Sequence, residues 1–145
     1  MIRVLLPSAP IDTAAELALL EGQGAGAVAS FTGLVRSDDG VLALELEHYP
    51  GATDAALLDL AQKAAARWDL LAATIVHRVG RMVPGDRIVF VGTAARHRAA
   101  ALDACAFLID RLKTDAPFWK REETAAGARW VAARAADDDA AQRWD

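Results

Sequence analysis

The sequence has very little cysteine and no long apolar run. Its single cysteine, Cys105, cannot form a disulfide within the chain, and there is no CxxC or Cys/His cluster of the kind that binds zinc. The apolar stretches are short and interrupted by charged residues or glycine, so neither a membrane span nor a secretory leader is expected. We therefore expect a soluble, cytoplasmic protein without a metal site.

Several catalytic signatures are missing as well. The sequence has no Gly-x-Ser-x-Gly motif and no pair of acidic residues suited to glycoside hydrolysis. The glycines at 22–26 follow a predicted helix and precede a predicted strand, which is the reverse of a dinucleotide-binding loop. His48 and His77 lack metal-ligand spacing and are interpreted as packed or partly exposed side chains, and Cys105 as a core residue.

Positive charge is scarce except in one segment. Residues 78–121 contain nine Arg or Lys and four Asp, whereas the rest of the chain contains seven basic and sixteen acidic residues. A local positive segment in an acidic protein favours a small anion or a charged peptide tail as the ligand, because nucleic-acid binding usually requires a broad basic face. Ordinary surface arginines would explain the same pattern.

The hydrophobic content of 54% in 145 residues is enough for one compact domain. Hydrophobic periodicity predicts helices at 13–20, 55–68 and 99–113 and strands at 3–6, 27–35, 41–49, 74–79 and 87–93, with short strands around Gly127. The strands at 27–35 and 41–49 are predicted to form a hairpin. The result is an α+β domain over residues 1–136, with two helices on an antiparallel sheet, and residues 137–145 are expected to be a flexible tail.

Three groups of basic side chains are candidates for a site. His97 and Arg98 begin a predicted helix, where free backbone N–H groups favour an anion. Arg36, at the mouth of the predicted hairpin, suits a charged clamp. Lys113 and Lys120 flank a proline turn that could bring their amines together, and a lysine amine in an apolar pocket can act as a nucleophile or a general acid or base. Most lysine pairs, however, are simply solvated.

Six sequence blocks stand out together: FTGLVR at 31–36, LEHYPG at 46–51, VHRVG at 76–80, PGDRIVFVG at 84–92, HR at 97–98 and LKTDAPFWKRE at 112–122. They resemble the large-subunit family of molybdopterin synthase. The blocks span nearly the whole chain in the order of the family, and the last is the most specific because it contains both lysines. The resemblance implies an α/β hammerhead fold with an additional small antiparallel β subdomain.

The resemblance also implies an activity and its partners. In that family a small ubiquitin-like sulfur-carrier subunit inserts its C-terminal Gly-Gly thiocarboxylate into the large subunit. The sulfur passes to cyclic pyranopterin monophosphate and forms the dithiolene of molybdopterin, a step in molybdenum cofactor biosynthesis. The implied protein is a cytoplasmic sulfurtransferase, a heterotetramer built on a central homodimer of large subunits, without a resident cofactor.

Matching positions imply individual roles. Lys113 and Lys120 correspond to catalytic lysines. The positions that correspond to substrate-binding residues are Leu34, Val35, Arg36, His97, Arg98, Lys113, Lys120, Arg121 and Glu122, with Phe31 and Arg134 as further pocket residues. Leu34 stands where the family often has lysine. Two other hypotheses fit the same residues: a pterin- or nucleotide-binding module that transfers no sulfur, and a structural partner that only holds the carrier's tail.

Overall fold

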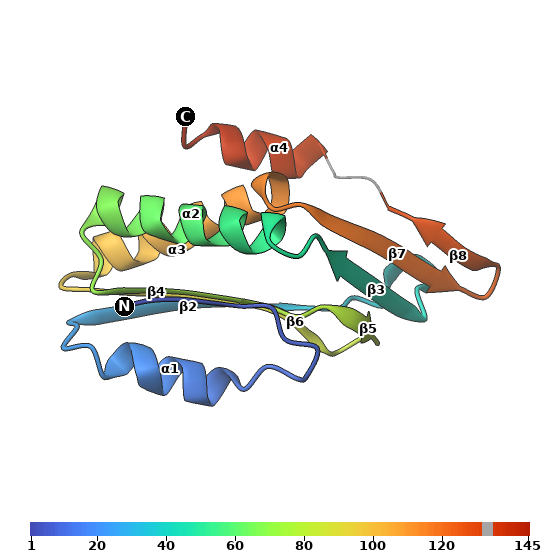
Figure 1. Ribbon diagram of the computed structural model, residues 1–145, viewed down its shortest axis with the longest axis horizontal. Coiled ribbons are helices and arrows are strands. Elements are labelled where there is room, and N and C mark those ends of the chain that lie inside the picture. Colours follow the sequence, from blue (N-terminus) through green and yellow to red (C-terminus); the bar gives the residue numbers. More distant parts are fainter. Residues whose placement is uncertain (132–134) are drawn as a thin grey trace.

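Two four-stranded sheets organise the chain in the computed structural model, which describes residues 1–131 and 135–145. Sheet A has the strand order β1 (Ile2–Leu5), β4 (Ala72–His77), β6 (Arg87–Ala95) and β2 (Ala27–Leu34). Sheet B has the order β5 (Gly80–Met82), β3 (Ala43–His48), β7 (Phe118–Thr124) and β8 (Gly127–Trp130). Figure 1 shows sheet B extending to one side of the body formed by sheet A and its helices.

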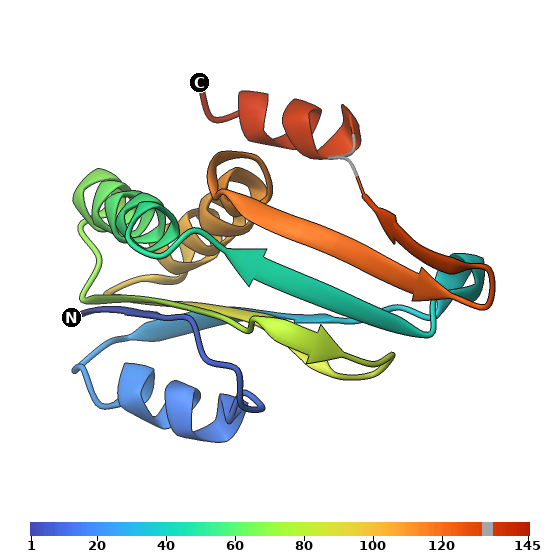
Figure 2. The same ribbon diagram turned by 45° about the vertical axis from the view of Figure 1, so that its right-hand side comes forward.

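Helices cover both faces of sheet A. Helix α1 (Thr13–Glu21) lies on one face, and α2 (Ala52–Trp68) and α3 (Arg98–Asp115) lie side by side on the other (Figures 1 and 2). Strand β4 is buried along its whole length, and its mainly apolar sequence suits a strand with both faces covered. The mixed α+β architecture predicted from the sequence is therefore confirmed.

Helical spacing explains the core between α2, α3 and the sheet. The buried stripe of α2 is Leu57, Leu60, Ala61 and Ala64, and that of α3 is Ala101, Ala104, Cys105, Leu108 and Leu112. These residues recur every three or four positions and so share one face of each helix. Burial also raises the pKa of the Cys105 thiol to about 11, which agrees with its interpretation as a core residue.

The predicted hairpin between residues 27–35 and 41–49 is wrong. β2 pairs antiparallel with β6, from Ala27 opposite Ala95, whereas β3 pairs with β5 and β7 in the other sheet. The chain leaves sheet A after β2 and enters sheet B through the short 3₁₀ turn Asp38–Gly40. An alternating pattern identifies a strand, but it does not identify the strand with which it pairs.

Sheet A also differs from the expected antiparallel arrangement. β1 and β4 pair in parallel, from Ile2 opposite Ala73 to Leu5 opposite Val76, whereas β6 is antiparallel to both β4 and β2. The three-residue strand β5, which the sequence analysis did not predict, pairs with β3. Within the described residues, no helix is long and apolar enough to cross a membrane.

The C-terminal segment is not the flexible tail that the sequence analysis expects. Residues Ala135–Gln142 form helix α4, which lies against the outer side of α3 (Figure 1). Beyond it, the ring of Trp144 packs edge-on against Trp68 and Phe107, with centroid distances of 5.7 and 5.8 Å, and its Nε1 donates to Asp110 Oδ2 at 2.8 Å. The acidic run suggested solvation, but the tryptophan after it anchors the segment.

Replacing Trp144 with alanine is expected to lower the free energy of unfolding by about 2 kcal/mol, since a partly buried ring and its hydrogen bond are both lost. Urea denaturation followed by circular dichroism measures the change. Trp130→Ala is the control, because that ring is 63% exposed and its loss should change stability much less. Equal effects of the two substitutions would show that Trp144 does not anchor the C-terminal segment.

Candidate functional site

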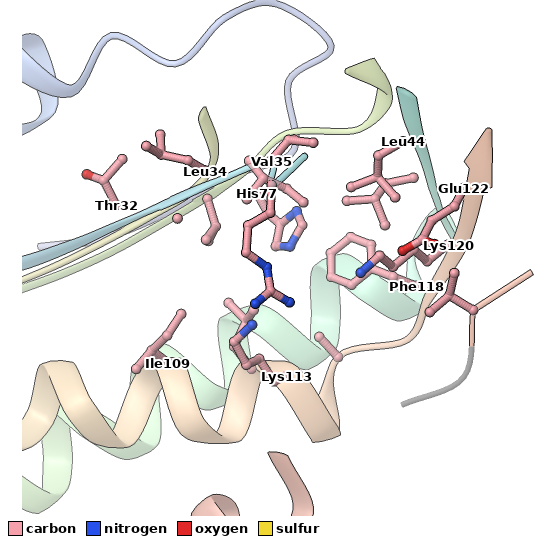
Figure 3. A pocket seen from close by; sticks show the side chains of 18 of the residues that line it. Thr32, Leu34, Val35, Leu44, His77, Ile109, Lys113, Phe118, Lys120 and Glu122 are labelled. Atoms are coloured by element: carbon pink, nitrogen blue, oxygen red, sulfur yellow. The ribbon is translucent and has the colours of Figure 1, made fainter. Parts of the chain in front are cut away.

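A cavity of about 760 Å³ lies between the two sheets and the last turns of α3 (Figure 3). Its lining comes from β2, β3, β4, β6, β7 and the C-terminal half of α3. Apolar side chains, including Leu44, Leu46 and Ile109, make up much of the wall, and a smaller set of polar side chains shares the space. A hollow that combines an apolar wall with a set of polar groups is suited to a small polar molecule.

The two lysines of the 112–122 motif line the same cavity. Lys113 extends from the last turn of α3 and Lys120 from β7, and both line the hollow (Figure 3). The connection between them is fixed by Thr53, whose hydroxyl donates to Pro117 O at 2.7 Å and accepts from Tyr49 N at 2.9 Å. Among the described residues, Lys113 has no hydrogen-bond or ion-pair partner, so its ammonium is available to a ligand.

Strand alternation divides the rest of the motif between two faces. Phe118, Lys120 and Glu122 line the cavity, and the intervening Arg121 points to the opposite face, as expected for a period of two. There Arg121 donates to Glu45 Oε2 at 2.9 Å across the sheet. The structure therefore gives no support to Arg121 as a substrate-binding residue of this cavity, whereas Glu122 lines it.

The end of β2 supplies the mouth of the cavity. Leu34, Val35, Arg36 and Phe31 all line it, and the strand bulges between Gly33 and Leu34. A Cβ added at Gly33 would lie 2.8 Å from Val89 Cγ1, so a side chain would not fit there without a shift of its neighbours. The guanidinium of Arg36 is 60% exposed and lies 3.6 Å from Asp38, a weak contact that leaves it accessible.

His97 and Arg98 do not reach this cavity in the same chain. Both are exposed at the N-terminal end of α3, and Lys113 lies fifteen residues further along that helix. At a rise of about 1.5 Å per residue, the two ends of this segment are roughly 22 Å apart. Arg134, the other predicted pocket residue, lies outside the described residues.

His77 lines the cavity, a role that the sequence analysis missed. It lies at the end of β4, is 7% exposed and stacks on Phe118 with a centroid distance of 4.2 Å. The pKa of His77 is lowered to about 4, mainly by burial; the Arg78 carbonyl acts in the opposite direction, and the positive charge of Lys113 adds a smaller lowering effect. The imidazole is therefore neutral near pH 7. His77 is a packed side chain, as interpreted from the sequence. The sequence pattern of one strand, however, does not show which face of that strand borders a cavity.

The lowered pKa of His77 predicts a loss of stability in mild acid. The unfolded chain binds this proton with a pKa near 6.5, so the contribution of His77 to stability is complete above that pH and declines as pH falls towards 4. Between pH 7 and pH 4.5 the loss should be about 2 to 3 kcal/mol. Urea denaturation at both pH values should show a smaller drop for His77→Phe than for the unaltered chain. An unchanged drop would contradict this account, and exposed His97→Gln serves as the control.

Comparisons with known proteins identify the family to which the chain is similar. The sequence profile of the MoaE protein family matches residues 6–115. The molybdopterin synthase catalytic subunit of Pseudomonas aeruginosa is 52% identical over 147 residues, covering 98% of each chain. The solved structure of the molybdopterin biosynthesis MoaE protein from Burkholderia ambifaria is 48% identical with a TM-score of 0.86, covering 99% of this chain and 98% of that one.

A more distant solved structure has the same fold. Molybdopterin synthase from Staphylococcus aureus is 29% identical and superposes with a TM-score of 0.81, covering 90% of this chain and 96% of that one. The family match covers most of the chain, and the relatives match it nearly end to end. The chain belongs to the MoaE protein family.

Proposed function

We propose that this chain is the catalytic subunit of a molybdopterin synthase, a cytoplasmic sulfurtransferase of molybdenum cofactor biosynthesis. It takes sulfur from the C-terminal thiocarboxylate of a small ubiquitin-like carrier subunit and places it on cyclic pyranopterin monophosphate. The observation that carries the proposal is that Lys113 and Lys120 line one cavity, in a chain whose relatives are molybdopterin synthase catalytic subunits.

The charges and size of the cavity suit these substrates. The carrier's thiocarboxylate and the cyclic phosphate are both anions, and positive charge is supplied by Lys113 of α3, Lys120 of β7 and Arg36 of the connection after β2. A volume of about 760 Å³ is within the usual range for a small-molecule site and leaves room for the end of a peptide tail beside a pterin.

The unpartnered ammonium of Lys113 gives the cavity its chemistry. When the acyl carbon of the tail is attacked, negative charge develops on its oxygen, and a cation already in place stabilises that charge without reorganisation. Lys113 fills this role in the proposal, and Lys120 assists as a second cation or proton donor. The apolar wall of Leu44 and Leu46 lowers the local dielectric constant and so strengthens the electrostatic interaction.

His97 and Arg98 fit the proposal through the homodimer. They lie too far from Lys113 to bind the same substrate molecule within one chain, and the family resemblance implies a central dimer. We infer that they contribute to the cavity of the second copy. Symmetry then gives each cavity Lys113 from one copy and the His97–Arg98 pair from the other.

Mixed dimers test this arrangement. Lys113→Ala and Arg98→Ala chains are each expected to be inactive alone, but a mixed dimer contains one cavity in which both residues are intact. After random exchange, about a quarter of the unaltered activity should return, because half of the dimers are mixed and each has one working cavity. No recovery, with exchange demonstrated by differently tagged chains, would show that both residues act within one chain.

Two other functions remain to be separated from the proposed one. A pterin- or nucleotide-binding module would bind the cyclic pterin but leave the carrier's sulfur in place. A structural partner would bind the carrier's tail with no requirement for the pterin. Incubation of the chain with the thiocarboxylated carrier and the pterin, each alone and together, distinguishes all three, because only a synthase consumes both.

A further inference from the structure

Besides the carrier's tail and the pterin, the proposed sulfur transfer requires water as a reactant. Once the tail sulfur has bonded to a carbon of the pterin, the tail and the pterin are joined by a thioester. To free the sulfur, the C–S bond to the acyl carbon must break and a C–O bond must form in its place. Water supplies that oxygen, and a proton acceptor beside the acyl carbon accelerates its attack.

Few groups in the cavity can accept this proton. An ammonium group has no lone pair, so Lys113 and Lys120 serve as acceptors only after losing a proton themselves. Glu122 is held by Arg129, whose Nη2 lies 3.1 Å from Glu122 Oε2. The carboxylate of Asp38 is 66% exposed at the mouth, beside Arg36. Among the described residues that line the cavity, His77 is the remaining titratable side chain.

The surroundings of His77 fix its orientation and its tautomer. Nδ1 lies 3.1 Å from the carbonyl oxygen of Arg78, and a carbonyl only accepts, so Nδ1 carries the hydrogen. Nε2 therefore bears the lone pair. The Phe118 ring, inclined by 27° to the imidazole, holds it from one side. Figure 3 shows the His77 side chain extending into the cavity between Val35 and Phe118.

The Nε2 atom is open to the cavity rather than sealed in the core. Among the described residues it has no hydrogen-bond partner, and the buried polar atoms that lack one are His48 Nδ1, Thr74 Oγ1 and Arg111 Nε. Because Nε2 has no partner and is not among these buried atoms, it must be accessible from a cavity or from the surface. The cavity that His77 lines is the one that Lys113 also lines. The lone pair thus faces the compartment in which the acyl carbon would lie.

We propose that His77 is the proton acceptor for the water that releases the carrier's tail, an inference that rests on the proposed sulfurtransferase function. Water attacks the acyl carbon and transfers a proton to Nε2 while the new C–O bond forms. The C–S bond then breaks, its electron pair leaves with the sulfur as a pterin thiolate, and the tail departs as a carboxylic acid. The proton on Nε2 passes to solvent and restores the neutral ring. Burial and Lys113 both favour that neutral form.

A single-turnover reaction followed by mass spectrometry separates the two chemical steps. With His77→Phe, which keeps the stacked ring but removes the lone pair, formation of the tail–pterin thioester should change by less than about threefold. Its hydrolysis should slow by roughly 10² to 10³-fold, so the adduct accumulates. His77→Gln, which accepts a hydrogen bond but does not take a proton, should give the same result. Each variant's melting curve establishes that it is folded.

Chemical rescue separates a proton acceptor from a structural residue. In His77→Ala, added imidazole should restore hydrolysis of the adduct, whereas pyrrole, which has a similar shape but no basic nitrogen, should not. Equal rescue by both, unchanged hydrolysis in the Phe and Gln variants, or an equal slowing of both steps would overturn the role of His77. If the unaltered chain transfers no sulfur, the proposed function itself fails, and that outcome is distinct because it does not depend on any variant.

Discussion

Replacing Lys113 with alanine is expected to reduce sulfur transfer by roughly 10³-fold or more, because the variant loses the preplaced cation that stabilises negative charge at the reacting carbon. Binding of the carrier and the thermal stability of the chain should change little. Lys113 is exposed in the last turn of α3 and makes no hydrogen bond or ion pair with any described residue, so its loss breaks no contact in the fold.

Two further lysine variants sharpen this prediction. Lys63→Ala removes an exposed lysine whose Nζ pairs with Asp59 on α2, far from the cavity lining, and should retain full turnover. Lys113→Arg keeps the positive charge but changes the shape of the group and its ability to exchange a proton. Substantial activity in Lys113→Arg together with none in Lys113→Ala would assign the charge, rather than proton transfer, as the main contribution. Full activity in Lys113→Ala would refute the catalytic role.

Replacing Phe90 with alanine is expected to lower the free energy of unfolding by about 3 to 5 kcal/mol, a large share of the stability of a domain of this size. The Phe90 ring is completely buried on the face of sheet A that α1 covers, in a cluster with Ile11, Leu20, Val76 and Ala94. Because this small cluster holds α1 against the sheet, its loss should loosen that helix first.

Urea denaturation measures this effect, and hydrogen exchange along α1 locates it. Phe31→Ala is the matched control, because the same atoms are removed from a ring that is 39% exposed, and it should cost much less stability. Equal losses in the two variants, or undiminished protection of α1 in Phe90→Ala, would contradict the assignment of Phe90 as the anchor of that helix.

Much of the fold follows from local sequence signals. The helical spacing of Leu57, Leu60 and Ala61 predicts α2 because only one face of that helix can be buried. The proline at 117 ends α3 and starts β7, which is how the sequence brings Lys113 and Lys120 into one cavity.

Apart from the short strand β5 and helix α4, which were not predicted, the errors concern pairing partners rather than elements. The pairing of β2 with β6, and of β3 with β7, joins segments separated by tens of residues, and no local pattern encodes that choice. The same limit applies to Trp144, whose anchoring depends on Trp68 and Phe107 in helices that precede it in the chain. Tertiary contacts of this kind override local composition.

The site residues could be predicted where they lie close together in one sequence motif. Both lysines and Glu122 lie in one block, and strand alternation alone would have separated Arg121 from them. His77 was not predictable as a cavity residue, because both faces of β4 are buried and nothing local distinguishes the face next to the cavity. His97 and Arg98 match the family in sequence, but within one chain they lie at the N-terminal end of α3, away from Lys113 and the cavity.

The most direct test of the central claim is to mix the purified chain with a thiocarboxylated carrier and cyclic pyranopterin monophosphate, and to determine the masses of both products. The account predicts that the carrier exchanges its terminal sulfur for oxygen while the pterin gains two sulfurs, and that neither change occurs with Lys113→Ala. A carrier that binds but keeps its sulfur would contradict the account and leave the chain as a binding protein.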